Sequence, residues 1–187
     1  LEETMTKLAE LRKSGVIRSI GVSNFSAAQL REALRYAPID AYQPEYNLLS
    51  RGIEAEIMPV CSANQISILS YNSLAKGLLT GAFHMHGTVL TPEDFRKDKP
   101  LFRKENMLLE QDLISCLKKI AAEHEVSIAQ VAIRWALEQP AMTSAIIGTQ
   151  NARHFIDNIQ AFSLSLSPQE VDVIRNASDR VIASLLQ

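Results

Sequence analysis

Few residues in this sequence are of the types on which disulfide-bonded and zinc-binding proteins depend. It has two cysteines among 187 residues, Cys61 and Cys116, and each lies in an apolar pattern of helical spacing without a C-x-x-C partner. A disulfide framework needs several cysteines that can pair, and a zinc site needs a close cluster of cysteine or histidine ligands. We therefore interpret both cysteines as buried free thiols, which is typical of a reducing compartment.

An excess of charge of one sign is also absent. The 19 basic and 21 acidic residues are interspersed and give a formal net charge of -2. The densest basic run, residues 96–104, is diluted by neighbouring acidic residues. We interpret it as a solvated loop or helix face, because a nucleic-acid site requires an unbalanced basic stripe. The charge pattern therefore predicts neither nucleic acid nor an anionic membrane as a partner.

Long apolar runs are missing as well. No segment approaches the length that crosses a bilayer, and the opening residues, LEETMTKLAELRKSG, have the spacing of an amphipathic helix and not of a signal peptide. We therefore expect a cytoplasmic protein. The composition, 47% hydrophobic and 21% charged, is that of an ordinary globular chain, so we predict a single domain over residues 1–187.

Segments with the periodicity of strands alternate with segments with that of helices, and the connections between them are short. This is the sequence form of parallel βα units. A long excursion is predicted over residues 82–106, where prolines and mixed charges break the pattern. Strands are predicted over residues 17–22, 41–45, 67–71 and 144–147, and helices over 2–13, 53–63, 107–124 and 152–161, with three more that begin at Ser26-x-x-Gln29, Ser127-x-x-Gln130 and Ser167-Pro168.

Polar residues follow each of the four predicted strands. Because the carboxyl ends of parallel strands meet at one rim, we expect these groups to converge there. Amide, hydroxyl and aromatic groups at such a rim suit a planar cofactor that carries phosphates, and the helix after Gly148 offers free N–H groups to an anion. The groups are Ser23-Asn24, Gln43 with Tyr46-Asn47, Tyr71-Asn72-Ser73, and Gly148-Thr149-Gln150-Asn151.

Each of these signals has a purely structural interpretation when taken alone. Ser23 and Asn24 are common turn residues, and Tyr71 fits the edge of a core. Two histidines, His84 and His86 in FHMHG, have a spacing that can face a metal ion, but no carboxylate or thiolate cluster accompanies them, so a solvated loop without a metal is favoured. His124 lies at a polar helix end and needs no role. Only the ordered occurrence of all four polar groups is specific.

Four motifs, in this order and spacing, carry a resemblance to a known family: GVSNFS, QPEYNLLSR, ILSYNSLAKGLLTG and IIGTQNARHFIDNI. Over residues 1–179 the sequence resembles the second half of the aldo-keto reductases, NAD(P)H-dependent oxidoreductases that fold as (β/α)8 barrels of the TIM type. The resemblance implies an α/β chain with four of the eight parallel strands. It also implies the reduction of aldehydes or ketones to alcohols in the complete barrel.

The resemblance assigns cofactor contacts position by position. Those to the nicotinamide are Ser23, Asn24 and Gln43, which hydrogen-bond its carboxamide, and Tyr71, which stacks on its ring. Those to the pyrophosphate are Ser73, Leu74, Lys76 and Gly77. Those to the adenosine and its 2′-phosphate are Gly148, Thr149, Asn151, His154, Asp157 and Asn158.

Two departures from the family pattern bear on function. Where many members place lysine and arginine around the 2′-phosphate, this sequence has Gly148 and His154, with Arg153 one position earlier. The resemblance implies NADPH as the cofactor, and this departure leaves NADH as the alternative. The catalytic Asp, Tyr, Lys and His of the family all lie on its first four strands, and the resemblance begins just beyond them. The chain is therefore expected to lack the catalytic tetrad.

Four βα units also leave a second hypothesis open. A sheet of four parallel strands has two free edges and an apolar inner face unless something completes it. The chain is then either the cofactor half of an oxidoreductase, which pairs with a missing N-terminal half, or a non-catalytic half-barrel module that binds a nucleotide or associates with itself.

Overall fold

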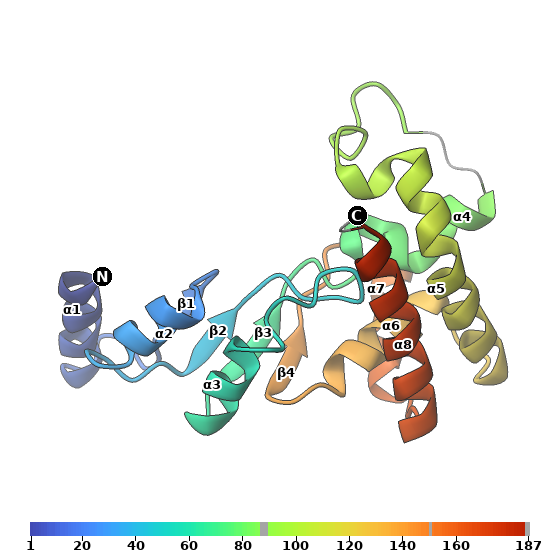
Figure 1. Cartoon of the computed structure of the whole chain (residues 1–187). Helices are drawn as coiled ribbons and strands as arrows, with labels where there is room; N and C mark the ends of the chain where they lie inside the picture. Colours follow the sequence, from blue (N-terminus) through green and yellow to red (C-terminus); the bar gives the residue numbers. More distant parts are fainter. Residues whose placement is uncertain (87–89, 150, 186–187) are drawn as a thin grey trace. The chain divides into compact units, whose positions relative to one another are not determined.

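The structure is a computed structural model that describes residues 1–86, 90–149 and 151–185 (Figure 1). The chain contains two compact units. We call the first, Leu1–Tyr46, Arg51–Tyr71 and Leu137–Ile146, the sheet unit. The second, which we call the helical unit, contains Asn47–Ser50, Asn72–Ala136 and the chain from Ile147 onward.

A parallel sheet of four strands forms the sheet unit, with the strands in the order of the sequence. The sequence therefore predicted the fold class correctly, and it also predicted that the sheet has two edge strands. Burial alternates along the strands, so that Tyr42 and Ile68 are buried while Gln43 and Leu69 beside them are only half-buried. The strands are β1 (Gly21–Ser23), β2 (Ala41–Gln43), β3 (Ser67–Ser70) and β4 (Met142–Ala145).

β1, β2 and β3 are shorter than predicted, and β4 has the predicted length but begins two residues earlier. Residues 17–20 do not form a strand, because the Ile20 amide donates to the Asp40 side chain at 2.8 Å instead of to a neighbouring strand. β2 ends at Gln43 because Pro44 has no N–H to donate. β4 covers Met142–Ala145 and not 144–147, because an irregularity of register between Ile68 and Leu69 brings Met142 opposite Ile68.

Three helices belong to the sheet unit: α1 (Glu2–Lys13), α2 (Ala27–Ala33) and α3 (Ile57–Ala63). α1 has the predicted bounds, and α2 has the predicted capping box, in which the Gln29 amide donates to Ser26 Oγ and the Ser26 amide donates to Gln29 Oε1. α3 begins at Ile57 and not at 53, because the residues before it form turns.

Helices make up the helical unit. The predicted excursion over 82–106 contains helical turns, and α5 begins at Lys104, before the predicted residue 107. α5 packs against α8. The elements are η1 (Ala75–Thr80), α4 (Ala82–His86), η2 (Pro100–Phe102), α5 (Lys104–Glu123), α6 (Ile128–Leu137, whose last residue belongs to the sheet unit), α7 (Ala152–Ile159), η3 (Gln160–Phe162) and α8 (Pro168–Leu185).

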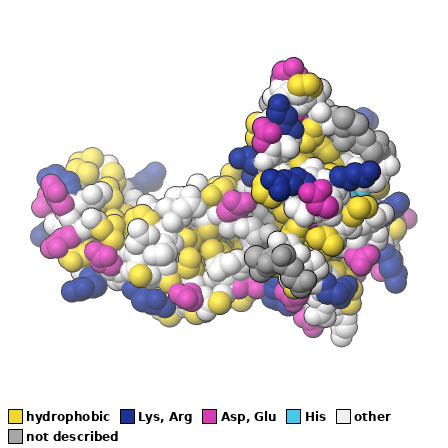
Figure 2. Space-filling view, turned by 45° about the horizontal axis from the view of Figure 1, so that its top comes forward, with side chains coloured by type: hydrophobic (Ala, Val, Ile, Leu, Met, Phe, Trp, Pro, Cys, Tyr) yellow, Lys and Arg dark blue, Asp and Glu magenta, His cyan; other side chains and the backbone are white. Residues whose placement is uncertain are grey.

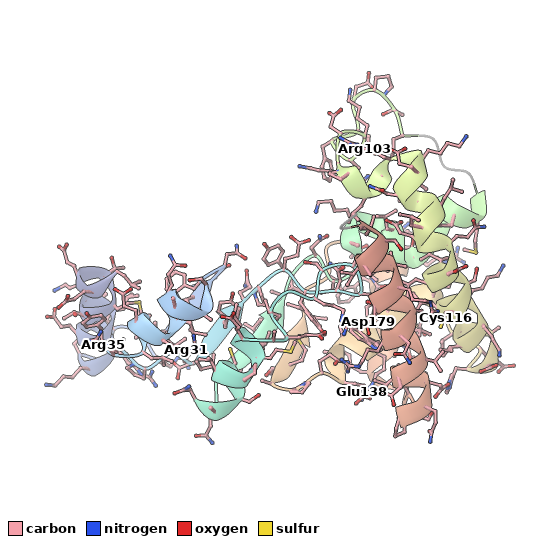
Figure 3. All side chains as sticks on the ribbon, viewed as in Figure 1. Arg31, Arg35, Arg103, Cys116, Glu138 and Asp179 are labelled. Atoms are coloured by element: carbon pink, nitrogen blue, oxygen red, sulfur yellow. The ribbon has the colours of Figure 1, made fainter. Side chains whose placement is uncertain are left out.

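Trp135 lies in the core of the helical unit. Its side chain is 0% exposed, and its indole N–H donates to the Val171 carbonyl at 3.2 Å. Cys61 is buried and Cys116, on α5 (Figure 3), is half-buried, and both are free thiols.

The basic side chains of the run over 96–104 are solvated as predicted, except that of Arg96, which is half-buried. The guanidinium of Arg96 lies over the rings of Phe83 and Phe102, which themselves meet edge to face at 5.2 Å. Elsewhere basic and acidic side chains lie interspersed on the face drawn in Figure 2. Within the described residues, no helix combines the length and apolar character that crossing a membrane requires.

Candidate functional site

The nicotinamide residues of the sequence analysis lie at the carboxyl ends of three adjacent strands. Ser23 ends β1 opposite Gln43, which ends β2, and Tyr71 directly follows β3. The Ser23 hydroxyl donates to the backbone carbonyl of Gln43 at 2.8 Å. The backbone N–H of Asn24 donates to the same carbonyl at 3.3 Å. The Tyr71 hydroxyl donates to Asn24 Oδ1 at 3.1 Å. The structure therefore brings all four residues together.

These bonds leave a defined set of polar atoms for a ligand. Asn24 Oδ1 already accepts a hydrogen bond from the Tyr71 hydroxyl, so the side-chain amide of Asn24 offers its two N–H groups to a ligand. Ser23 has committed its proton and keeps its oxygen as an acceptor, while the Gln43 side chain makes no hydrogen bond to any residue that the structure describes. A primary carboxamide has one acceptor and two donor hydrogens, so this set is complementary to it.

Backbone conformation supports a binding role for this edge. Asn24 has φ 57°, in the left-handed region that non-glycine residues seldom occupy. Asn is among the side chains that tolerate it best, and the two hydrogen bonds of Asn24 hold it there. Strain of this kind persists where surrounding contacts fix it, as is common at binding sites.

The residues assigned to the pyrophosphate form a tight turn in the helical unit. Asn72, Ala75, Lys76 and Gly77 have φ of 55°, 47°, 55° and 98°. The Lys76 amide donates to Asn72 Oδ1 at 2.8 Å, and the Asn72 carbonyl accepts from the Ala75 amide at 2.8 Å and from Asn47 Nδ2 at 2.9 Å. Ser73 in this turn is buried, whereas the side chain of Lys76 is exposed.

The residues assigned to the adenosine form the loop before α7 and part of that helix. The Asn151 side chain caps α7 by accepting from the Arg153 amide at 2.8 Å, and Thr149 Oγ1 accepts from the Asn151 amide at 3.2 Å. Gly148 and His154 are exposed. Gln150, which the sequence analysis included at this strand end, lies outside the described residues.

Asp157 has a structural role that the sequence did not indicate. Its carboxylate accepts from Ser127 Oγ at 2.8 Å and from Gln130 Nε2 at 2.7 Å, which ties α7 to the start of α6. The predicted capping box at Ser127 is therefore wrong in one half: the Gln130 amide donates to Ser127 Oγ, but the Gln130 side chain turns to Asp157. Asn158, the next residue, is half-buried.

The predicted residues thus form two groups in two units. The four nicotinamide residues are connected by hydrogen bonds in the sheet unit. The other ten lie in the helical unit, on the turn at the start of η1 and on the loop before α7 with that helix: Ser73, Leu74, Lys76, Gly77, Gly148, Thr149, Asn151, His154, Asp157 and Asn158.

Two histidines have acidic partners that sequence spacing could not reveal. His84 is not in a solvated loop: its side chain is 7% exposed, and Nε2 lies 3.3 Å from Glu110 Oε2 on α5. Burial raises the pKa of Glu110, and His84 opposes the shift. His124 Nε2 lies 2.6 Å from Glu170 Oε1. No group of three or more metal-ligating side chains occurs among the described residues, and the side chain of His86 lies outside that part of the structure.

Comparison with known proteins finds relatives along nearly the whole chain. The Aldo/keto reductase family matches residues 1–179. The NADH-specific methylglyoxal reductase of Escherichia coli is 31% identical over 179 residues, which are 96% of this chain and 54% of that protein. Aldo-keto reductase yakc (NADP(+)) of Schizosaccharomyces pombe is 34% identical over 183 residues, 96% of this chain and 53% of that protein.

A solved structure extends the likeness to the fold. The glycerol dehydrogenase from Gluconobacter oxydans superposes with a TM-score of 0.88 and 30% identity over 97% of this chain, but over 55% of its own. The chain therefore spans about half the length of the relatives that it matches, and its four parallel strands correspond to half of a TIM-type barrel.

Proposed function

We propose that this chain, which belongs to the aldo/keto reductase family, is the cofactor-binding half of an oxidoreductase that reduces aldehydes or ketones to alcohols with NAD(P)H. The observation that carries the proposal is the connected cluster of Ser23, Asn24, Gln43 and Tyr71 at the carboxyl ends of β1 to β3. Its donors and acceptors are complementary to the carboxamide of a nicotinamide.

Each residue of the cluster has a distinct task in this proposal. The side-chain N–H groups of Asn24 donate to the oxygen of the nicotinamide carboxamide. Ser23 Oγ and Gln43 Oε1 accept from the N–H groups of that carboxamide. The ring of Tyr71, fixed at its hydroxyl by Asn24 and at its amide by the Pro44 carbonyl, stacks on the nicotinamide ring. The bound nicotinamide supplies the hydride. These contacts orient the ring so that one face points to the substrate, which is the positioning part of catalysis.

The proton donor is proposed to come from the part of the relatives that this chain does not match. All four tyrosine hydroxyls of this chain are engaged: Tyr36 donates to Glu2, Tyr42 to the Phe25 carbonyl, Tyr46 to Glu54 and Tyr71 to Asn24. Proton transfer by a positioned acid contributes roughly 100- to 10,000-fold to a rate. We therefore expect this chain alone to bind cofactor and to turn over carbonyl substrates poorly.

NADPH is the proposed cofactor, with NADH as the alternative. The names of two relatives point in opposite directions, since one is called NADH-specific and the other carries NADP(+). The candidate 2′-phosphate segment of this chain has Arg153 and an exposed His154 in the first turn of α7. The charge of Arg153 and the N-terminal dipole of α7 favour a phosphate there.

A second candidate function is a non-catalytic module that associates with a second copy of itself. Two observations favour it. β1 and β4 each pair with one neighbour only among the described strands. α7 has no buried residue, and apolar side chains on it and on η3 are exposed: Phe155, Ile156, Ile159 and Phe162. Open strand edges and exposed apolar side chains both favour association.

The proposed function is tested by titration of the purified chain with NADPH and with NADH, followed by cofactor fluorescence. The Ser23→Ala, Asn24→Ala double variant removes two hydrogen bonds worth about 1 kcal/mol each, so it is expected to weaken binding roughly 10- to 30-fold. Tyr71→Phe keeps the ring and loses the bond to Asn24, so it should weaken binding less than Tyr71→Ala.

The matched control is Ser19→Ala, because Ser19 is exposed and lies outside the cluster. It is expected to bind cofactor as the unchanged chain does. A chain that is folded by circular dichroism yet shows no saturable binding of either dinucleotide would contradict the proposed function and favour the association module.

A further inference from the structure

One side chain joins the segment after α4 to the strained turn at the start of η1. Arg96 Nη1 donates to the Lys76 carbonyl at 3.2 Å. The same nitrogen lies close to Gly77, where an added Cβ would be 3.7 Å from it. Both sides of this contact lie in the helical unit.

Three side chains fix the position of this guanidinium. Its carbon lies 5.0 Å from the ring centroid of Phe83 and 5.8 Å from that of Phe102. Asp94 accepts from Arg96 Nη2 at 2.5 Å, from Nε at 2.9 Å and from the Arg96 amide at 2.9 Å. A planar guanidinium that is paired at two nitrogens and stacked on rings has a defined orientation, which a lysine ammonium in its place lacks.

The turn that Arg96 contacts needs external support. Ala75 and Lys76 are adjacent non-glycine residues with positive φ, and the left-handed conformation costs roughly 1–2 kcal/mol for each. Such a conformation persists only where the surroundings over-determine it. Both peptide groups of Lys76 are held: Asn72 Oδ1 accepts from its N–H, and Arg96 donates to its carbonyl.

We propose that Arg96 is a positioning residue for the cofactor, which holds the turn Ala75–Gly77 in the shape that binds the pyrophosphate and acts through the Lys76 carbonyl, not through its own charge on a phosphate. The identity of the ligand rests on the proposed function. The positioning role of Arg96 rests on its contacts with the turn in the ligand-free structure. The bidentate Asp94 carboxylate balances the charge of the guanidinium, which makes Arg96 a support and not an anion site.

Asp94 makes the two mechanisms separable. If Arg96 acted directly on a phosphate, Asp94→Asn would remove a competing negative charge and strengthen cofactor binding. If Arg96 positions the turn, Asp94→Asn loosens the guanidinium and weakens binding. Arg96→Lys gives a second contrast, because it keeps a positive charge and loses the stacked, bidentate geometry.

The experiment compares Arg96→Met, Arg96→Lys and Asp94→Asn with the unchanged chain and with Arg103→Met. Arg103 is an exposed arginine of the same segment, just before α5 (Figure 3), and serves as the matched control. Hydrogen exchange of the amides of residues 75–80 is measured without ligand, and NADPH and NADH are then titrated into each protein.

The three variants are expected to exchange faster over residues 75–80 and to bind NADPH about tenfold more weakly, while Arg103→Met changes neither. Unchanged exchange in Arg96→Met, full affinity in Arg96→Lys or tighter binding in Asp94→Asn would each overturn the proposal. If the unchanged chain binds no dinucleotide, the proposed function is wrong and no ligand is assigned to this turn. The hydrogen-exchange data still decide whether Arg96 stabilises the turn.

Discussion

Glu110 is the one fully buried acidic side chain among the described residues, at 1% exposed. Its neighbour His84 comes from α4, and neither carboxylate oxygen has a hydrogen bond within the described structure beyond the 3.3 Å contact to His84 Nε2. A carboxylate in such a place is stable only if it is paired or protonated, and burial accordingly raises the pKa of Glu110.

The raised pKa of Glu110 makes a prediction about pH. An acid whose pKa is higher in the folded than in the unfolded state loses stability as the pH rises through that interval, because the unfolded chain releases the proton first. Glu110→Gln removes this loss and keeps the shape of the side chain. The free energy of unfolding of the unchanged chain, relative to that of Glu110→Gln, is expected to fall as the pH rises above 4.5.

Urea unfolding of both proteins at several pH values measures this difference. The control is Glu123→Gln, which changes an exposed acid on the same helix. The prediction would be contradicted if the free energy of unfolding of the unchanged chain rose with pH relative to that of Glu110→Gln. Such a rise would mean that an ion pair between Glu110 and protonated His84 outweighs the cost of burying the carboxylate.

At the same scale, sequence predicted the positions of the nicotinamide residues but not their bonds. Ser23, Gln43 and Tyr71 could be found because each one ends or follows a strand of buried character. The bond from Tyr71 to Asn24 could not, since it joins β1 to β3 across β2 and depends on the register of all three. His84 was wrongly predicted to be solvated because its partner Glu110 is on another helix.

At the scale of elements, α7 is tied to α6 by one carboxylate. Asp157 accepts from Ser127 and Gln130, and Gln130 also donates to the Asp157 carbonyl. The capping pattern Ser127-x-x-Gln130 resembles the one at Ser26, yet of these two only the pattern at Ser26 forms the reciprocal box. The local spacing is the same in both places. The difference is due to Asp157, which is distant in sequence and therefore cannot be found from the local spacing.

Replacement of Asp157 is expected to affect stability through this junction. Asp157→Ala should lower the free energy of unfolding by about 2 kcal/mol, because it leaves the half-buried Ser127 and the buried Gln130 without their partner. Ser127→Ala should cost about 1 kcal/mol, and the double variant less than the sum, since both remove the same bond. Urea unfolding of the four proteins provides the cycle; strict additivity would show that the junction carries no coupling.

The bounds of the elements differ from prediction for similar reasons. Strand periodicity over 17–22 was real, but the Asp40 side chain takes the Ile20 amide and leaves only Gly21–Ser23 in the ladder. The excursion after Thr80 was recognised by its prolines, while the packing of Arg96 on two rings within it depends on aromatic residues at both of its ends. Periodicity therefore predicted the elements, and competing side chains set their ends.

At the scale of the whole molecule, the sheet has two strands with one neighbour each, and the apolar residues of α7 and η3 are exposed. We expect the chain to associate as its concentration rises, and light scattering over a dilution series measures the apparent mass. Phe155→Glu with Phe162→Glu should lower that mass, because it places charge on the exposed apolar helix.

Val16→Glu is the control for this prediction, as Val16 is 70% exposed and belongs to the sheet unit. It is expected to leave the apparent mass unchanged. A single, monomeric species at every concentration would count against association through either the strand edges or α7.

The strands follow one another in space in the order of the sequence, and this has a consequence for synthesis on the ribosome. β1, β2 and β3 leave the ribosome in quick succession, so β2 and β3 each find a neighbouring strand already present. β4 comes only after η1, α4, η2, α5 and α6 have been made. At roughly 5–20 residues per second, the outer edge of β3 waits for several seconds. Among the strand edges that become paired within the described sheet, it is the one that a nascent chain leaves open for longest.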